Sequence, residues 1–339
     1  MSDIRSWLTT LPKAELHLHL EGAIPLPALW NLMQKYGGDP SVASPEALRK
    51  WLTYPDFPAF IDAWIWKNGY LREYEDFTTI AEAAARDLAR QNIIYAEMFF
   101  SPSRFTAQGL TPQGLAQAIR RGFDRVAETE IWLIADLVRD DGPDQAARTL
   151  RQVQEVRDCG IVGIGIGGSE HRCPPEPFAA VYDQARAFGF RTSAHAGEAA
   201  GAESVRGALD ALAVDRIGHA TRAEEDPALI DRLGLSGVPL ELCPLSNLAT
   251  GVISDIAEHP VRRYWDRGLM VTINTDDPGM FHNSLVDEYA VLHETFGFTP
   301  VDIRALVMNA VRAAWRPSSA AGSLVEQFTT DPGWLLPGD

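Results

Sequence analysis

Short motifs rich in histidine and acidic residues recur along this sequence, and the first of them places His17 and His19 two residues apart. If this stretch is a β-strand, the two imidazoles point to the same face, because side chains alternate along a strand. Two imidazoles on one face can bind one metal ion, and imidazole suits zinc well. Taken alone, an H-x-H pair is better explained as a half-buried strand with histidine on its polar face.

The pair is not alone, because further histidines and carboxylates follow later apolar stretches. His195 opens the motif His195-Ala-Gly-Glu198, His219 ends another such stretch, and Asp276 and Asp277 follow the last one. Three histidine nitrogens and one carboxylate oxygen leave a coordination position open for water, which is typical of catalytic metal sites, whereas structural zinc sites are closed and usually rich in cysteine. The best predicted ligand set is His17, His19, His195 and Asp276.

The other residues of these motifs suit acid–base chemistry. A bound metal ion lowers the pKa of its water toward neutrality and so supplies hydroxide. His219 would take the proton of that water and orient it, and Glu198 would face the substrate as a proton donor. Asp277 is expected to point either across the backbone or into the pocket. The four remaining histidines are expected to have ordinary surface or capping roles: His171, His259, His282 and His293.

The elements that must position these residues are short apolar stretches that alternate with helical patterns. Such alternation indicates a parallel sheet of the α/β class, and eight such units close into a (β/α)8 TIM barrel. In this fold the active site lies at the C-terminal ends of the strands, where the motifs fall. After a first strand that ends at His17 and His19, the predicted strands cover residues 93–100, 131–137, 161–166, 191–195, 215–219, 238–243 and 269–275, and the predicted helices between them cover 111–128, 143–158, 177–188, 202–212, 227–233 and 257–267.

Two stretches carry helices beyond the regular alternation. A long, mostly helical connection runs from about residue 24 to residue 90, and further apolar helices follow Asn283 and pack outside the barrel. Connections of this length usually carry their own structure or a function. The aromatic-rich part of the first connection, residues 57–70, is expected to lie over the pocket mouth. No shift in composition marks a second domain, so residues 1–339 are predicted to form a single domain.

Composition limits the classes of partner and the compartment. Thirty Lys and Arg residues against 46 Asp and Glu give a formal charge of −16, which repels phosphate backbones and disfavours a nucleic-acid partner. A small neutral or cationic substrate fits this field better. Three cysteines without a C-x-x-C pair suit a reducing compartment. The N-terminus has no signal-peptide pattern and no apolar run reaches membrane-spanning length, so a cytoplasmic protein without a membrane partner is expected. The oligomeric state stays open.

The glycine-rich stretch from Gly163 to Glu170 follows a predicted strand, which raises the question of a dinucleotide site. Its spacing is not that of a G-x-G-x-x-G fingerprint leading into a helix. Glycine also allows a backbone to approach a flat ligand closely. We therefore interpret this stretch as such a close approach.

Five motifs together carry a family resemblance: Pro12-Lys-Ala-Glu-Leu-His-Leu-His-Leu-Glu-Gly22, Ser193-Ala-His-Ala-Gly-Glu198, Ile217-Gly-His-Ala220, Cys243-Pro-Leu-Ser-Asn247 and Asn274-Thr-Asp-Asp-Pro278. In their types and order they resemble the adenosine/adenine deaminase family. The resemblance implies a zinc-bound barrel of the amidohydrolase superfamily that hydrolyses a 6-aminopurine to the 6-oxopurine and ammonia.

The resemblance also implies roles for single residues. It assigns the zinc to the ligand set already derived, water activation to His219 and protonation of purine N1 to Glu198. Asp277 would hydrogen-bond N7, and the backbone at Gly168 would meet N3. Because a bridging lysine is absent after the fourth strand, where Ile166-Gly-Gly-Ser169 stands, one metal ion per chain is expected. Zinc is the expected ion, with iron or another divalent metal as alternatives. The H-x-E…P-C-x-x-C signature of the other zinc deaminases is absent.

Departures from the family pattern bear on the substrate. Glu21 stands where adenosine deaminases typically carry an aspartate that binds the ribose 5′-hydroxyl, and it resembles adenine deaminases and deaminases of 5′-modified nucleosides such as aminodeoxyfutalosine or methylthioadenosine. At Gly167, however, the adenine enzymes carry an acidic residue. A 5′-modified adenine nucleoside is therefore the predicted substrate, followed by adenosine and then by adenine. The alternatives are an adenine deaminase, an amidohydrolase acting on a non-purine ring, and a barrel that binds purines without turnover.

Overall fold

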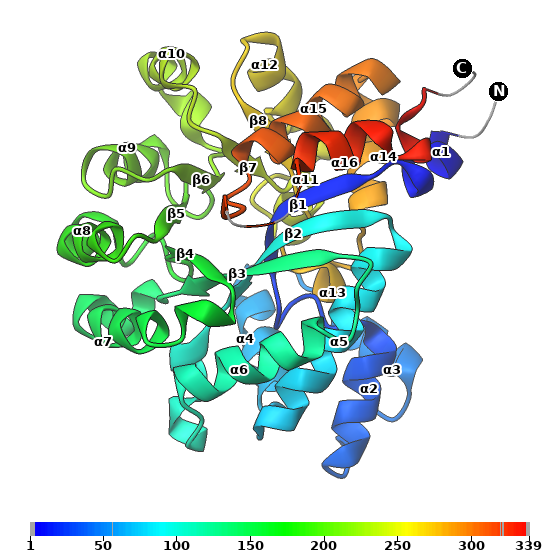
Figure 1. The fold of residues 1–339 in the computed structure, drawn as a ribbon, viewed down its shortest axis with the longest axis vertical. Coiled ribbons are helices and arrows are strands. Elements are labelled where there is room, and N and C mark those ends of the chain that lie inside the picture. The colour runs from blue at the N-terminus through cyan, green and yellow to red at the C-terminus, as the bar shows by residue number, and fades with distance from the viewer. Residues whose placement is uncertain (1–3, 56, 319, 321, 337–339) are drawn as a thin grey trace.

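The computed structural model describes residues 4–55, 57–318, 320 and 322–336. Eight parallel strands pair in chain order from β1 to β8 and form the centre of the molecule, and helices surround them (Figure 1). The strands are β1 (Lys13–His19), β2 (Ile93–Phe100), β3 (Glu130–Asp136), β4 (Ile161–Gly165), β5 (Arg191–Ala196), β6 (Arg216–His219), β7 (Leu240–Leu242) and β8 (Val271–Ile273). This arrangement is a (β/α)8 barrel, which confirms the predicted fold class.

The helices fall into three groups. An N-terminal helix and four more between β1 and β2 are α1 (Ile4–Thr10), α2 (Leu26–Lys35), α3 (Pro45–Trp51), α4 (Phe57–Asn68) and α5 (Tyr74–Arg90). Those that alternate with the later strands are α6 (Pro112–Phe123), α7 (Gly142–Gln154), α8 (Ala179–Ala187), α9 (Ala202–Asp210), α10 (Pro227–Ser236), α11 (Pro244–Ala249) and α12 (Val261–Asp266). After β8 come α13 (Pro278–Phe281), α14 (Leu285–Phe296), α15 (Pro300–Ala313) and α16 (Leu324–Thr330).

Local sequence signals explain where many helices begin and end. Thr111 caps α6 by accepting a hydrogen bond from the Gly114 N–H, and proline follows at the first helical position. Such a cap satisfies one of the N–H groups that a helix start leaves free, and proline lacks the N–H that would be free there. Thr299 and Asp302 form a capping box at α15. Gly237 ends α10 in the left-handed conformation that glycine adopts without strain.

The first strand shows how the barrel separates its two faces. All seven residues of β1 are buried, as expected for a strand that is covered on both sides. His17 and His19 point into the barrel together, where their rings lie 5.5 Å apart between centroids. The leucines between them, Leu16 and Leu18, therefore point outward and belong to the apolar core.

The barrel closes between its last and first strands through the backbone of Asp276. Leu18 and Asp276 form an isolated parallel bridge between the end of β1 and the segment after β8. The His19 N–H donates to the Asp276 carbonyl at 2.8 Å, and the Asp276 N–H donates to the His17 carbonyl at 3.1 Å. The backbone that closes the barrel is thus the backbone that carries three predicted metal ligands.

The predicted elements are largely confirmed. Each predicted strand is present, and β2 has the predicted bounds. Strands β7 and β8 are shorter than predicted at both ends, and the short helices α11 and α13, which periodicity did not indicate, follow them. No helix in the described part of the chain combines the length and apolarity that a membrane crossing requires. A single domain over residues 1–339 stays a prediction.

Candidate active site

The four predicted metal ligands come together at the C-terminal ends of the strands. His17 Nε2 lies 3.1 Å from His195 Nε2, and His19 Nε2 lies 3.1 Å from the same atom. The Asp276 Oδ1 oxygen lies 3.4 Å from His19 Nε2 and 3.7 Å from His17 Nε2. All four donor atoms lie within 4.8 Å of one another. Four bonds of about 2.0 Å arranged as a tetrahedron place donors roughly 3.3 Å apart, so the spacing fits one small metal ion.

The charges in this cluster also favour a cation. Burial lowers the pKa of His19 and that of His195, so both rings are neutral and offer lone pairs. Burial acts the same way on His17, but hydrogen bonds to Asp276 and Glu241 prevail and raise its pKa to about 10. The same histidines outweigh the effect of burial on Asp276 and hold its pKa well below the usual range. A cluster that holds a proton this firmly suits a metal ion, which replaces that proton.

Two side chains to which the sequence assigned no role contact these ligands. The Glu241 carboxylate accepts from His17 Nδ1 at 2.8 Å, which leaves the lone pair of Nε2 free for a metal. The Ser246 hydroxyl donates to Asp276 Oδ2 at 2.6 Å. Burial alone would raise the pKa of Glu241, but Arg216 and His17 keep it below its ordinary value. In the sequence, Glu241 is only one polar residue in an apolar strand.

Backbone conformation at the strand ends is unusual. His219 has φ of 64° and Asp276 has φ of 68°, in the left-handed region that non-glycine residues rarely adopt. Each such residue costs on the order of 1–3 kcal/mol and persists only where its surroundings impose it. The strain therefore marks both positions as held for the sake of their side chains.

Glu198 and His219, the two residues predicted to act as acid and base, lie side by side next to the ligand cluster. Glu198 Oε2 lies 3.5 Å from His219 Nε2, and both side chains are buried. Burial, helped by Asp276 and Glu170, raises the pKa of Glu198 well above its usual range, so this carboxyl group carries a proton. Burial lowers the pKa of His219 to about 3, so its ring is neutral. The Nε2 atom of His219 has no hydrogen-bond partner among the described residues.

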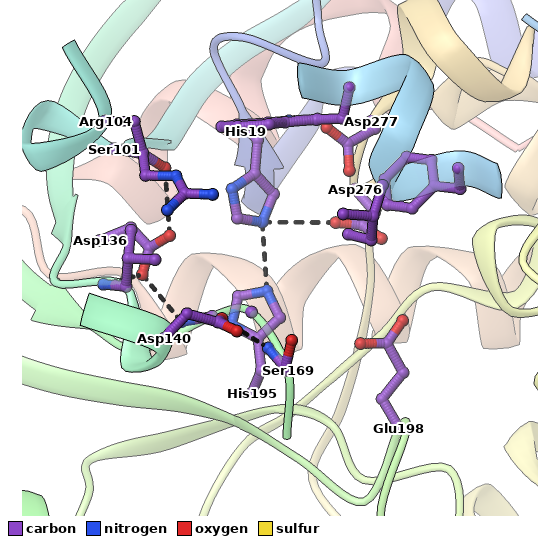
Figure 2. A pocket seen from close by; sticks show the side chains of 16 residues that line it. His19, Ser101, Arg104, Asp136, Asp140, Ser169, His195, Glu198, Asp276 and Asp277 are labelled. Carbon is purple, nitrogen blue, oxygen red and sulfur yellow. Dashed lines mark hydrogen bonds and ion pairs between the residues drawn. The ribbon is translucent and has the colours of Figure 1, made fainter. Parts of the chain in front are cut away.

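Asp277 points into the cavity, one of the two directions expected for it (Figure 2). Burial, followed by the charge of Asp276, raises its pKa well above the usual range, so Asp277 is a hydrogen-bond donor at neutral pH. Its side chain packs on Gly22, where a Cβ atom would lie 1.6 Å from the Asp277 Oδ1. Glycine at position 22 therefore makes room for this carboxyl group.

Glu170 supports the segment that carries Glu198. Its buried carboxylate accepts four backbone N–H groups in succession: Gly197 at 2.5 Å, Glu198 at 3.0 Å, Ala199 at 2.7 Å and Ala200 at 3.0 Å. A carboxylate is the side chain that can accept this many bonds, because it has about four lone-pair sites. In the sequence, Glu170 is only the last residue of the glycine-rich stretch.

A cavity opens from the ligand cluster toward α4. Together with its open mouth it holds about 770 Å³ of space that no protein atom fills. Phe60, Ile61 and Trp64 of α4 line it, so the predicted aromatic segment does contribute to the wall. The buried Lys67 ties α4 to the end of β1 by donating to the Glu21 carbonyl. Figure 2 shows the polar lining, in which His19, His195 and Asp276 lie on one side of Ser101, Arg104 and Asp136.

The two remaining predicted binding residues lie in different places. Gly168 lines the cavity with φ of 103°, and a Cβ atom there would lie 2.1 Å from Asp140 Oδ2, so glycine is required. Glu21 is buried behind the wall, where its Oε1 accepts from the Ser101 N–H at 2.9 Å. A contact of Glu21 with substrate stays a prediction, and Ser101 lies between this carboxylate and the cavity.

The other histidines do not join the site. His259 is buried and accepts from the Val261 N–H at 3.2 Å. His282 and His293 contact the backbone carbonyls of Arg49 and Phe298. These contacts fit the ordinary roles expected for them.

Comparison with known proteins places this architecture in a family. The sequence model described as "Adenosine deaminase" matches residues 12–330. The chain belongs to the adenosine deaminase family. An adenine deaminase from Rhodospirillum rubrum is 37% identical over 314 residues, which cover 91% of this chain and 93% of that protein. An aminodeoxyfutalosine deaminase from Streptomyces avermitilis is 33% identical over 341 residues, which cover 99% and 95%.

A solved structure of an amidohydrolase from Burkholderia ambifaria, with bound zinc, superimposes with a TM-score of 0.85. It is 29% identical and covers 94% of this chain and 90% of its own. The predicted family and superfamily are therefore confirmed. Members with two different activities resemble this chain about equally, so family membership leaves the substrate to be argued from the site.

The link between Glu241 and His17 leads to a prediction about metal binding. Substituting Glu241→Gln leaves the shape but removes the charge that fixes the His17 tautomer, so we expect metal affinity to fall about 10- to 100-fold. Metal content should be measured on folded protein after dialysis against graded chelator. Glu294→Gln, which changes an exposed ion pair with Arg5, is the matched control and should keep its metal. Equal metal retention in both variants would contradict this role for Glu241.

The four hydrogen bonds that the Glu170 carboxylate accepts lead to a second prediction. In Glu170→Gln, an NH2 group replaces one of the two oxygens that accept these backbone N–H groups. Because a donor then faces donors, the segment 197–200 should loosen. Hydrogen exchange at these four amides should speed up, and kcat should fall by up to about 100-fold because Glu198 is displaced. Metal content should not change. Amides at 197–200 that stay protected from exchange in the variant would show that the Glu170 carboxylate is not needed to hold this segment. Glu224→Gln on the surface is the control.

Proposed function

We propose that this protein hydrolytically deaminates a 6-aminopurine nucleoside, releasing ammonia and the 6-oxopurine nucleoside, with one zinc ion per chain. Iron or another divalent ion is the alternative metal. The proposal rests on one observation above all, that the Glu198 carboxyl group and the His219 imidazole lie 3.5 Å apart beside a cluster of four potential metal ligands at a cavity. When bound there, the metal ion would supply hydroxide at neutral pH by lowering the pKa of a coordinated water.

The residues around the cluster match the edge of a 6-aminopurine. Ring nitrogens N1 and N7 accept hydrogen bonds, and the raised pKa values of Glu198 and Asp277 make both carboxyl groups donors. Glu198 gives its proton to N1 as water adds to C6, and Asp277 holds N7. The His219 ring, whose Nε2 atom faces Glu198, orients the attacking water and receives its proton. His219 then passes this proton to the amino group, the C6–N bond breaks and ammonia leaves, while the remaining hydroxyl proton returns to Glu198 as the C6 carbonyl forms.

Two rival functions fit the site less well. A barrel that only binds purines does not need three buried, oriented titratable groups beside a ligand cluster. An amidohydrolase for a non-purine ring does not need both Glu198 and Asp277, two carboxyl groups that can donate hydrogen bonds to two ring nitrogens. The complete set of groups therefore favours turnover of a purine.

The shape of the cavity favours a nucleoside over free adenine. Beyond the ligand cluster the wall continues with Ser101, Arg104 and Asp140, and with Trp64 of α4. If Glu198 and Asp277 hold the base, these polar and aromatic side chains remain for the sugar of a nucleoside. An adenine-sized ligand would make no use of this part of the wall. The cytoplasm is the compartment we propose for this reaction.

The distinction between metal ligands and acid–base residues can be tested by substitution. Glu198→Gln cannot deliver a proton to N1, and His219→Ala cannot orient water, so we expect each variant to keep its metal and to lose roughly 10²- to 10⁴-fold in kcat. Asp276→Asn is the positive control and should lose metal together with activity. Atomic absorption on the purified variants and a spectrophotometric deamination assay measure both quantities. A drop in metal content in the first two variants would show that they are ligands instead.

Substrate preference provides a separate test. Specificity constants should rank a 5′-modified adenine nucleoside first, adenosine second and adenine last. The differences should be graded, because a difference of methylene size is worth only about 1–3 kcal/mol. The assay should include 5′-methylthioadenosine and aminodeoxyfutalosine. A higher kcat/KM for adenine than for each nucleoside would assign the protein to the adenine deaminases.

A further inference from the structure

A second cavity lies at the opposite end of the barrel from the ligand cluster. Its lining comes from the beginnings of β3, β4 and β5 and from the segment after α15, and it includes Trp132, Ile161, Arg191 and Trp315. Together with its open mouth it holds about 1200 Å³ of space that no protein atom fills, against about 770 Å³ at the ligand cluster. None of its described lining residues also lines the active-site cavity, and no step of the proposed deamination uses it.

An apolar layer separates this cavity from the ligand cluster. The residues that pack together there are Phe99, Ile134, Val162 and Trp315. On the side of the active site, the ring of Phe99 lies 5.0 Å from the rings of His17 and His19. On the other side, Val162 and Trp315 line the second cavity. A ligand in the second cavity would therefore not reach the metal ligands, so the two cavities are separate.

The charge of the second cavity is opposite to that of the whole chain. Its described lining holds three arginines, Arg157, Arg191 and Arg316, and one carboxyl group, that of Asp158, which gives a net formal charge of +2. The whole chain carries a formal charge of −16. A local excess of positive charge on an acidic protein draws anions toward that part of the surface.

Two of these guanidinium groups keep charge and donors for a further partner. Arg157 donates to the carbonyls of Phe188 and Gly189, at 2.9 and 2.7 Å, so its hydrogen-bond partners are neutral. Arg191 makes one ion pair, from Nη1 to Asp215 Oδ1 at 3.1 Å, and is 61% exposed. A guanidinium has five N–H donors, so most of those of Arg191 remain available. The cavity therefore presents two arginines that an anion can reach.

The wall beside these arginines offers a flat aromatic surface. Trp132 is half-buried, and its indole N–H donates to Glu130 Oε1 at 2.7 Å. Glu130 is held in turn by Arg316, whose Nε and Nη2 atoms donate to both of its oxygens. These contacts fix the plane of the Trp132 ring. A ring that is already fixed loses little freedom when a planar group stacks on it, which favours binding.

We propose that this cavity is a second binding site, which takes a small planar aromatic molecule that carries a phosphate or carboxylate group. The aromatic ring stacks on Trp132, and the anionic group meets Arg157 and Arg191. Phosphate and carboxylate share the chemistry that matters here, since both accept parallel hydrogen bonds from a guanidinium fork. A nucleotide and an aromatic carboxylic acid are the two sources of such a ligand. The inference does not depend on which substrate the active site deaminates.

The test compares aromatic anions with neutral analogues. Uridine 5′-monophosphate is paired with uridine, and 1-naphthoate is paired with 1-naphthamide, in calorimetric titrations of the metal-loaded wild-type protein. We expect at least one anion to bind ten times or more tightly than its neutral partner and than inorganic phosphate. The pair that shows the effect distinguishes a nucleotide from a carboxylic acid. The preference should shrink as ionic strength rises, because Arg191 is exposed.

The position of the bound probe can be read from a tryptophan signal. The chain has nine tryptophans, and after labelling with 5-fluorotryptophan the ¹⁹F resonance of Trp132 is the one lost in Trp132→Phe. This resonance should shift during the titration, with the dissociation constant that calorimetry gives.

Substitution of the arginine makes the test specific. Arg191→Met removes a charge at the cavity, so the affinity for the aromatic anion should fall roughly tenfold while that for the neutral analogue stays the same. Arg104→Met, which removes a partly exposed arginine from the active-site cavity, is the matched control and should leave the affinity unchanged. Melting temperatures confirm that each variant is folded.

Three outcomes would overturn the inference. In the first, neither aromatic anion binds more tightly than its neutral analogue. In the second, the anion binds but the Trp132 resonance does not move. In the third, Arg104→Met loses affinity and Arg191→Met keeps it, which would locate the anion in the active-site cavity. The proposed deamination stands in each case, because it is measured by a separate assay.

Discussion

The Glu241 carboxylate lies between a permanent cation and a metal ligand, and the active site depends on this contact. One oxygen pairs with Arg216 Nε at 2.5 Å, and the other accepts from His17 Nδ1 at 2.8 Å. Arg216 also pairs with Glu97 at 2.6 Å, and its guanidinium lies over the ring of Trp315. Buried charges cost several kcal/mol each unless they are paired. Inside this barrel the pairing ends at the ligand cluster, so the interior of the fold and the site form one network of charges.

Exclusion of water explains why chemically similar side chains take different roles. Burial keeps a proton on Glu198 and Asp277, whereas the nearby histidines keep Asp276 ionised. Burial also keeps the ring of His219 neutral. One physical cause, modified by the nearest charge, therefore separates a metal ligand from two hydrogen-bond donors. The protein needs no special residue types for this, only different neighbours for three carboxyl groups.

The sequence was sufficient to predict the barrel, its strands and the convergence of the four ligands, because these follow from alternation and from residues at strand ends. It was not sufficient for Glu170 and Glu241. Glu241 contacts His17, which is 224 residues away along the chain. Glu170 contacts Gly197, which is 27 residues away. No local pattern records such a pairing.

The ligand cluster spans the seam of the barrel, and this has a consequence for biosynthesis. His17 and His19 are made before Asp276, which comes after the eighth strand and joins β1 by backbone hydrogen bonds. A nascent chain on the ribosome holds two ligands early but cannot complete the set until nearly the whole barrel has emerged and closed. A metal ion that needs all four ligands would therefore bind only after the barrel has closed, and its binding would report that the two ends of the sheet have met.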